Sequence, residues 1–376
     1  MLVLYRASSW RQLFQCDFPP DASTLPPLLA PLRDALLELG REPTLAEAHR
    51  WQSTLVEALT RLDLPAWRIS QLISDHNDWL YRRAIMLSLD EMQGLGWGKP
   101  PVEFCVLTLG SAGRHDSLMA PDQDNAMIIA DYPDSRHTEI DGYFQSLGER
   151  FTDRLDAAGI PLCQGHVMAR YPMWRKRLGE WQHQLTLWTA ERRVKRVQQA
   201  NILLDFHPVL GDARLAEALS SHVTELMPRA GLFLDEMGAL LDEYPPALDR
   251  FGRLQGGGED APHDTAFNLK HQALLPLVSA IRLLALRHGV CAMETRARLT
   301  ALVIKDALSI HQARSIEATL GRLQAYLLDE QRRSLKALRR IDGWVDLARL
   351  DEGERLMLRH DLRQIRALIR QAKANA

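Results

Sequence analysis

The sequence predicts an α+β fold that is mostly helical, in which one small mixed sheet lies between helical N- and C-terminal regions. Two apolar runs of strand length, residues 104–109 and 126–130, predict neighbouring strands. Long stretches before and after them repeat apolar residues at the spacing of an amphipathic helix. We therefore expect a helical N-terminal region over residues 1–100, a mixed domain over 101–212 and a helical C-terminal domain over 213–376.

The N-terminal region shows a helix-start pattern and a long helical repeat. Thr44 is followed three residues later by Glu47, which is the spacing of a capping box. A longer amphipathic helix is predicted over residues 69–87 by apolar residues three and four positions apart. No catalytic motif is recognised here. We interpret the region as a bundle for packing, docking or dimerisation, which leaves a homodimer open.

The middle of the chain is predicted to alternate helices and short strands. Residues 141–158 have helical spacing and end at Gly159, a good helix stop. Residues 160–168 and 202–204 are predicted strands. A stripe of indole rings between them fits the buried face of an amphipathic helix better than a base-stacking surface. The stripe consists of Trp174, Leu178, Trp181, Leu185 and Trp188.

The C-terminal region is predicted to be helical from residue 213. Residues 213–226 form its first helix, and a strongly apolar helix is expected to open at Phe267. The last helix has a basic stripe, for which a solvated face is the default interpretation and an acidic partner or nucleic-acid backbone is the alternative. The stripe comprises Arg355, Arg359, Arg363, Arg366, Arg370 and Lys373.

The composition is that of an ordinary globular protein. The 376 residues carry a formal net charge of −2, so a generally basic nucleic-acid binder is not indicated and nucleic acid is not an expected partner. The cysteines form no C-x-x-C pair and predict neither a zinc framework nor a disulfide scaffold. No signal peptide or membrane-spanning segment is recognised, so we expect a cytoplasmic protein without a membrane partner. The four cysteines are Cys16, Cys105, Cys163 and Cys291.

Two aspartates stand just before the second predicted strand. Side chains alternate faces along a strand, so Asp122 and Asp124 point the same way and Gln123 points the other way. Adjacent carboxylates repel unless a cation lies between them, and Mg²⁺ binds carboxylate and phosphate oxygens. The pair therefore predicts a Mg²⁺ site, although a D-x-D taken alone is most often a solvated strand end.

A glycine-serine turn follows the first predicted strand. Gly110 would let a phosphate approach the backbone, where free N–H groups and the Ser111 hydroxyl could hold phosphate oxygens. Arg114 could neutralise a terminal phosphate through two parallel hydrogen bonds. A lone Gly-Ser is a common turn. Its place before the aspartate pair, with each motif joined to an apolar strand, indicates a nucleotide site more specifically.

Residues 110–129, which read GSAGRHDSLMAPDQDNAMII, resemble the motif of bacterial nucleotidyltransferases related to the PII-protein uridylyltransferase. These belong to the superfamily typified by DNA polymerase β. Two later stretches agree, over residues 202–212 and 267–282. The match runs from about residue 69 to about residue 328. The resemblance implies that the mixed domain is a nucleotidyltransferase domain.

The resemblance also implies roles for individual residues. Asp205 would be the third carboxylate, catalytic and metal-binding together with Asp122 and Asp124, and it would help to deprotonate the acceptor. The reaction would be the transfer of a nucleoside monophosphate from UTP or ATP, dependent on Mg²⁺ or Mn²⁺. A protein hydroxyl in a signalling pathway is the implied acceptor. The implied nucleotide-binding residues are Gly110, Ser111, Arg114 and Lys270.

Two positions depart from the pattern of that family. Asp116 stands where Glu is usual, and His207 stands where Arg is commoner, so a cation beside the third acid is in doubt. Two other classes of function stay open. One is a nucleotide-binding regulatory or sensor protein without turnover. The other is a helical scaffold whose basic C-terminal helix docks a partner, which leaves residues 103–131 unexplained.

Overall fold

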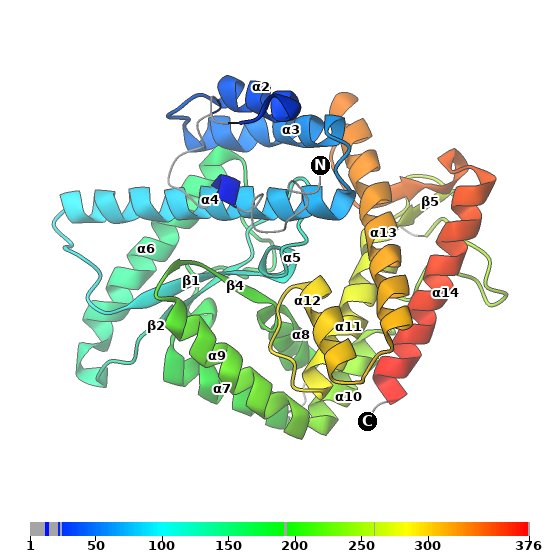
Figure 1. The fold of residues 1–376 in the computed structure, drawn as a ribbon. Helices are drawn as coiled ribbons and strands as arrows, with labels where there is room; N and C mark the ends of the chain where they lie inside the picture. The colour runs from blue at the N-terminus through cyan, green and yellow to red at the C-terminus, as the bar shows by residue number, and fades with distance from the viewer. Residues whose placement is uncertain (1–11, 15–21, 23–24, 192–193, 259, 375–376) are drawn as a thin grey trace. The chain divides into compact units, whose positions relative to one another are not determined.

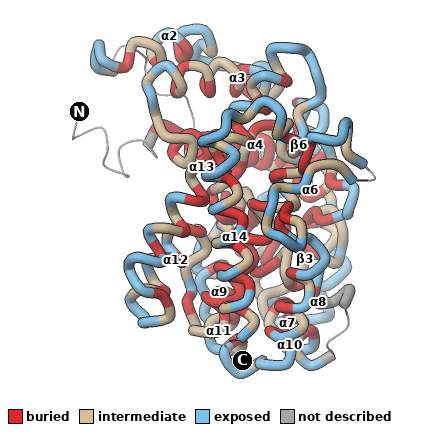
Figure 2. Tube along the Cα trace, turned by 90° about the vertical axis from the view of Figure 1, so that its right-hand side faces the viewer, coloured by how far each residue is buried: buried red, intermediate tan, exposed pale blue. Residues whose placement is uncertain are grey.

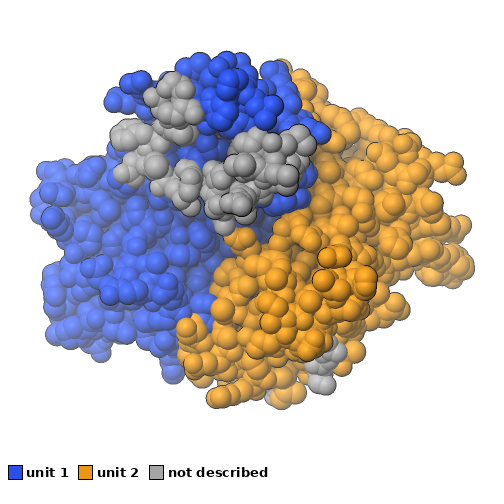
Figure 3. Space-filling model, in the orientation of Figure 1, with its two compact units in different colours: residues 1–184, 202–220 blue, residues 185–201, 221–376 orange. Residues whose placement is uncertain are grey.

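The computed structural model describes residues 12–14, 22, 25–191, 194–258 and 260–374. The chain divides into two compact units (Figure 3), one of residues 1–184 and 202–220 and the other of residues 185–201 and 221–376. Helices dominate both, and a small mixed sheet lies in the first, so the predicted α+β, mostly helical class is confirmed. No helix in the described part of the chain is long and apolar enough to cross a membrane. Cys16 lies outside the described residues.

Unit 1 contains a four-stranded mixed sheet in the order β3-β2-β1-β4 (Figure 1). The central strand β1 pairs antiparallel with β2 on one side and with β4 on the other, and β3 runs parallel to β2 at the edge. Every residue of β1 and β2 is buried, which explains why both strands are continuous apolar runs and do not alternate. The strands are β1 (Phe104–Leu109), β2 (Asn125–Ile129), β3 (Arg175–Arg177) and β4 (Phe206–Gly211).

The predicted capping box forms at the start of α3. The Glu47 amide donates to Oγ1 of Thr44 at 3.2 Å, and the Thr44 amide donates to Oε2 of Glu47 at 2.8 Å. The long helix α4 packs on α3 and α6 and also contacts β4. Besides the short α5 described below, the helices of unit 1 are α2 (Ala30–Leu39), α3 (Leu45–Arg61), α4 (Ala66–Gly94), α6 (His137–Ala158) and most of α9 (Ala213–Leu226).

Two predicted strands are wrong. Residues 202–204 do not form a strand, because Ile202 and Leu203 end helix α8 (Val194–Leu203) and the strand β4 begins only after Asp205. Residues 160–168 form a turn with a single bridge between Leu162 and Gln123. Short apolar runs do not distinguish a strand from the last turn of a helix, since both bury every side chain.

The indole stripe is buried, as predicted, but it does not lie on one helix. Trp174 belongs to the 3-10 turn η6 (Pro172–Trp174), which is followed by the strand β3, and helix α7 begins only at Leu178. Trp181 and Trp188 are both buried, and Nε1 of Trp181 donates to the carbonyl oxygen of Met127 in β2 at 3.0 Å. The rings therefore serve packing, which is the interpretation that we preferred over base stacking. The predicted helical stretch includes residues 192–193, which lie outside the described residues.

Unit 2 is built around the buried helix α11, which packs on α10, α12 and α14. Residues 266–268, which we expected to open that helix, form the strand β5 and pair antiparallel with β6. A π-helical turn then leads into α11. The elements are α10 (Gly231–Leu240), β5 (Ala266–Asn268), η8 (Lys270–Leu274), α11 (Leu275–Arg287), α12 (Thr295–Ile304), α13 (Ile310–Lys336), β6 (Trp344–Asp346) and α14 (Glu352–Ala374).

The basic stripe of α14 is partly used inside unit 2. Arg363 donates to the carbonyl oxygen of Gly252 at 3.1 Å, and Arg366 donates to the carbonyl oxygens of Asp249 and Leu248. Buried and exposed positions alternate along the helix at helical spacing (Figure 2). Part of the stripe therefore binds backbone carbonyls of its own unit and is not a free cationic face.

Candidate active site

The two aspartates of the acidic pair, Asp122 and Asp124, lie at the end of the sheet where strand β2 begins. Asp122 is exposed and Asp124 is half-buried, whereas Gln123 between them is fully buried. The alternation predicted from the sequence is therefore present: both acids face one side and the amide faces the other. The backbone places Asp124 beside the end of β1, because the Leu109 amide donates to the carbonyl oxygen of Asp124 at 3.0 Å.

Two buried amide side chains hold the acidic pair in place. Nε2 of Gln123 donates to the carbonyl oxygens of Thr152 at 2.9 Å and Ile160 at 2.8 Å. Oδ1 of Asn125 accepts from the Ala169 amide at 2.8 Å. A buried polar side chain is tolerated only when it is hydrogen-bonded, so these contacts fix the backbone on both sides of Asp124. The acids are thus carried on a rigid support.

The glycine-serine motif forms the short helical turn α5 (Gly110–Gly113), directly after β1. Gly110 has a φ of +61°, in the left-handed region that glycine adopts without strain. A Cβ atom there would lie 3.6 Å from Oδ2 of Asp124, so the turn and the acidic pair are in contact distance of each other. The first amides of such a turn have no acceptor within it and can serve an anion.

Asp205 lies on the other side of the same turn. The Gly110 amide donates to the carbonyl oxygen of Asp205 at 2.9 Å, so Asp124 and Asp205 flank the end of β1 from the two neighbouring strands. Gly113 packs so closely on Asp205 that a Cβ atom at Gly113 would lie 2.4 Å from that carbonyl oxygen. The close approach explains the second glycine of the motif. Topology therefore places the backbones of Asp124 and Asp205 at the same end of β1, but the carboxylate of Asp205 binds Arg114 and is not part of the ligand group that contains Asp122 and Asp124.

Arg114 is held between two carboxylates in this structure. Its Nη1 donates to Oδ2 of the fully buried Asp205 at 2.6 Å, and its Nε donates to Oδ2 of Asp116 at 2.9 Å. Burial alone would lower the pKa of Arg114, but the two carboxylates outweigh burial and raise it. A cation does stand beside the third acid, although the His207 departure had put one in doubt. It comes from Arg114, not from β4.

Cys163 completes a small group of side chains around the acidic pair. One ligand atom from each of Asp122, Asp124 and Cys163 lies within 4.8 Å of the others. Burial, and then the charge of Asp124, raises the pKa of the Cys163 thiol to about 11. The sulfur therefore keeps its proton at neutral pH and the group offers carboxylate oxygens. That donor set fits a hard cation such as Mg²⁺.

Three further residues were considered: Lys270 and Arg282 belong to unit 2, and His166 belongs to unit 1. Lys270 is exposed and begins the turn η8 of unit 2. Arg282 is buried in α11 and donates to Asn201 and to Ser279. His166 is exposed, and its Nδ1 lies 3.2 Å from the Tyr171 hydroxyl oxygen.

Sequence reasoning missed three contributors to the site. Cys163 was expected only within the predicted strand over residues 160–168, Gln123 was expected only to face away from the two acids, and no role was predicted for Asn125. The signal for the two amides was present in the sequence, since polar residues beside a continuous apolar run are buried and must be hydrogen-bonded. No such signal exists for Cys163, because the segment that places it beside the acids is a turn and not a strand.

Two family models match the chain. Residues 50–195 match the family described as "Putative nucleotidyltransferase DUF294". Residues 231–376 match the model described as "Putative nucleotidyltransferase substrate binding domain". A search of curated proteins found no match. The two family matches together cover most of the chain, and the first contains the turn α5 and the acidic pair. The chain therefore belongs to this family of nucleotidyltransferases.

Proposed function

We propose that the protein transfers a nucleoside monophosphate from a nucleoside triphosphate to an acceptor hydroxyl, in a reaction that depends on Mg²⁺ or Mn²⁺. The observation that carries the proposal is that the acidic pair and the turn α5 lie next to each other at one end of the central strands β1 and β2. Oδ2 of Asp124 lies 3.6 Å from the position of a Cβ atom on Gly110. A triphosphate on the turn would therefore have its charge beside carboxylates that need a cation between them.

Each residue of the site has a proposed task. The amides of α5 that follow Gly110 and the hydroxyl of Ser111 hold phosphate oxygens, and Gly110 leaves room for them. Asp122 and Asp124 would hold the divalent cation, which would neutralise the phosphate oxygens. The acceptor oxygen attacks the α-phosphorus, the bond to the pyrophosphate oxygen breaks, and the proton of the hydroxyl passes to a base. Catalysis of this kind depends on position and charge more than on covalent chemistry.

Asp205 is the proposed third carboxylate of the site. Its carbonyl oxygen accepts a hydrogen bond from the Gly110 amide, and its carboxylate forms an ion pair with Arg114. We assign to Asp205 the role that the family resemblance implies, which is that of a metal ligand that helps to deprotonate the acceptor. Arg114 in turn is proposed to act through Asp205 and, when a nucleotide is present, on a phosphate group.

The donor and the acceptor are proposed from the family resemblance. UTP or ATP would be the donor, and the hydroxyl of a signalling protein would be the acceptor, as in the PII-protein uridylyltransferase. Lys270 is proposed to bind the nucleotide phosphates from unit 2. The match of residues 231–376 to a substrate-binding domain supports a substrate role for that unit.

A nucleotide sensor without turnover is the second candidate. The buried ion pair between Arg114 and Asp205 favours it, because the two groups already neutralise each other and neither is offered to a substrate in this structure. Such a protein would still bind a nucleotide and a cation through the acidic pair.

One experiment separates the two candidates. The purified chain is incubated with Mg²⁺ and each α-labelled nucleoside triphosphate, with and without host lysate. The variant Asp122→Asn/Asp124→Asn tests the site, and Asp90→Asn, an exposed aspartate of α4, is the matched control. Label on a protein with the wild type and the control, but not with the double variant, supports transfer. Binding that needs Mg²⁺, without any transfer of label, supports the sensor.

A further inference from the structure

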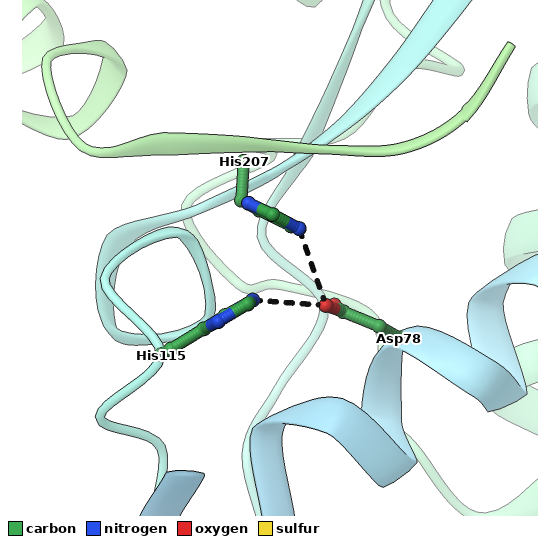
Figure 4. A group of neighbouring side chains, drawn as sticks. All are labelled: Asp78, His115 and His207. Carbon is green, nitrogen blue, oxygen red and sulfur yellow. Dashed lines mark hydrogen bonds and ion pairs between the residues drawn. The ribbon is translucent and has the colours of Figure 1, made fainter. Parts of the chain in front are cut away.

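A second group of ligand-type side chains lies in unit 1, separate from the acidic pair. Asp78 of α4, His115 of the loop after α5 and His207 of β4 meet (Figure 4). Nε2 of His115 lies 3.0 Å from Oδ2 of Asp78, and Nε2 of His207 lies 3.8 Å from the same oxygen. The imidazole rings are 4.2 Å apart between centroids. We call these three residues the histidine cluster.

The loop that carries His115 is anchored on α4 in several places. Oγ of Ser70 donates to the carbonyl oxygen of Ser117 at 2.8 Å, and the Ser117 amide donates to Oγ of Ser74 at 3.1 Å. His115 itself has a φ of +54°, a left-handed conformation that costs a residue with a side chain about 1 kcal/mol or more. The anchored loop holds this strained backbone in place, and the result is that the ring faces Asp78.

The spacing of the cluster is that of a tetrahedral metal site. Zinc binds imidazole nitrogen and carboxylate oxygen at about 2.0–2.1 Å, which places neighbouring ligand atoms about 3.3–3.4 Å apart. The two measured separations from Oδ2 of Asp78, 3.0 Å and 3.8 Å, lie on either side of that value. One ligand atom from each residue lies within 4.8 Å of the others, so small side-chain rotations would complete the geometry.

The surroundings supply the other features of a metal centre. Oδ1 of Asp75, one turn before Asp78 on α4, lies 3.9 Å from Nδ1 of His115, which is longer than a hydrogen bond and within ion-pair range. The side chains of Asp78 and His115 are 4% and 3% exposed, whereas that of His207 is 37% exposed. Two ligands are thus held in the interior, and the third is partly exposed, so that solvent could supply a fourth ligand.

The geometry points to a binding site for a divalent transition metal, of which Zn²⁺ is the best fit, held by Asp78, His115 and His207. Imidazole ligands favour Zn²⁺ over Mg²⁺, in contrast to the carboxylate oxygens of the acidic pair. The ion would tie α4, the loop after α5 and β4 together. This site does not depend on nucleotidyl transfer and would form in a sensor as well.

The test uses the full chain after removal of metals by a chelator. The background Asp122→Asn/Asp124→Asn removes the acidic pair as a competing site. Titration with ZnCl₂ by calorimetry should show one Zn²⁺ per chain in this background. Loading with Co²⁺ should give the strong visible absorption of a tetrahedral site. Adding His207→Ala should weaken Zn²⁺ binding more than about 100-fold, since even loss of an outer partner costs about 10–100-fold.

Matched variants separate a metal site from a structural ion pair. His311→Ala changes an exposed histidine of α13 and should leave Zn²⁺ binding unchanged. His207→Cys restores a ligand and should recover binding, and Asp75→Asn should weaken binding less than His207→Ala does, because Asp75 lies 3.9 Å from His115 and is not a proposed ligand. No bound Zn²⁺ in the double-variant background would overturn the proposal. Equal binding by the His207→Ala chain, with native circular dichroism and melting temperature, would also overturn it.

Discussion

The acidic pair and the histidine cluster are two sets of ligand-type side chains in the same unit, and they differ in how they are built. The pair comes from one short segment and is open to solvent: Asp122 is exposed and Asp124 is half-buried. The cluster comes from a helix, a loop and a strand, and two of its three side chains are buried. Local sequence can therefore encode an open site that waits for a charged substrate, whereas an enclosed site needs tertiary packing.

The largest expected effect is on transfer when the acidic pair is neutralised. Asp122→Asn/Asp124→Asn removes the charge that attracts the cation, so the rate of label transfer should fall more than about 100-fold. The melting temperature should stay within a few degrees, because neither side chain is buried. The same chain should retain Zn²⁺ at the histidine cluster. Loss of both label transfer and Zn²⁺ binding would show that the two sets of residues form one site.

The next largest effect is on stability when Asp205 is changed. Asp205→Asn leaves the buried guanidinium of Arg114 with the carboxylate of Asp116 as its partner. Removing one side of a buried ion pair typically costs about 3 kcal/mol or more. Urea denaturation measures this change, and Asp116→Asn is the matched control. The control should cost less, because Asp116 is half-buried and water can replace it. Equal losses would mean that the two carboxylates are equivalent.

A smaller stability effect is expected from the glycine that packs on Asp205. Gly113→Ala places a Cβ atom 2.4 Å from the carbonyl oxygen of Asp205, so the backbone must shift at a cost of about 1–3 kcal/mol. Gly142→Ala, in α6, meets nothing within 4 Å and should be neutral or stabilise by up to about 1 kcal/mol. Thermal melting of the Gly113→Ala and Gly142→Ala variants measures the two effects. A Gly113→Ala chain as stable as the wild type would contradict the packing of α5.

The effect that is smallest at neutral pH concerns a buried histidine outside the histidine cluster. Burial, and then the charge of His49, lowers the pKa of His76 from 6.5 to about 3 in the folded chain. The unfolded chain therefore binds the extra proton between these values. The free energy of unfolding should fall as the pH drops from 6.5 toward 3, by up to about 1.4 kcal/mol per pH unit.

The His76 prediction is checked by urea denaturation across this pH range. His76→Gln cannot bind the proton, so its stability should vary less with pH than that of the wild type. Zn²⁺ binding should be unchanged in this variant, since His76 is not one of the three proposed ligands. If the stability of His76→Gln varied with pH as much as that of the wild type, the pKa of His76 would not be lowered in the folded chain.

Much of the fold followed from local patterns. The runs that became β1 and β2, the capping box at Thr44 and the helix stop at Gly159 were all predicted, because each depends on neighbouring residues and on one period. The short elements were not predicted. Residues 202–204 ended a helix, and β3 appeared where a helix was expected, since three residues carry too little periodicity to choose between the two.

The candidate site divides in the same way. By itself the sequence determined the acidic pair and the turn, since both lie within residues 110–124 and strand alternation alone turns Asp122 and Asp124 to one face. Tertiary structure decided that Arg114 binds Asp205, that Cys163 stands beside Asp124, and that Asp78, His115 and His207 meet. These contacts join residues up to 129 positions apart, from Asp78 to His207. Chain geometry sets neighbours only within a turn or a strand, and burial in the folded unit selects the rest.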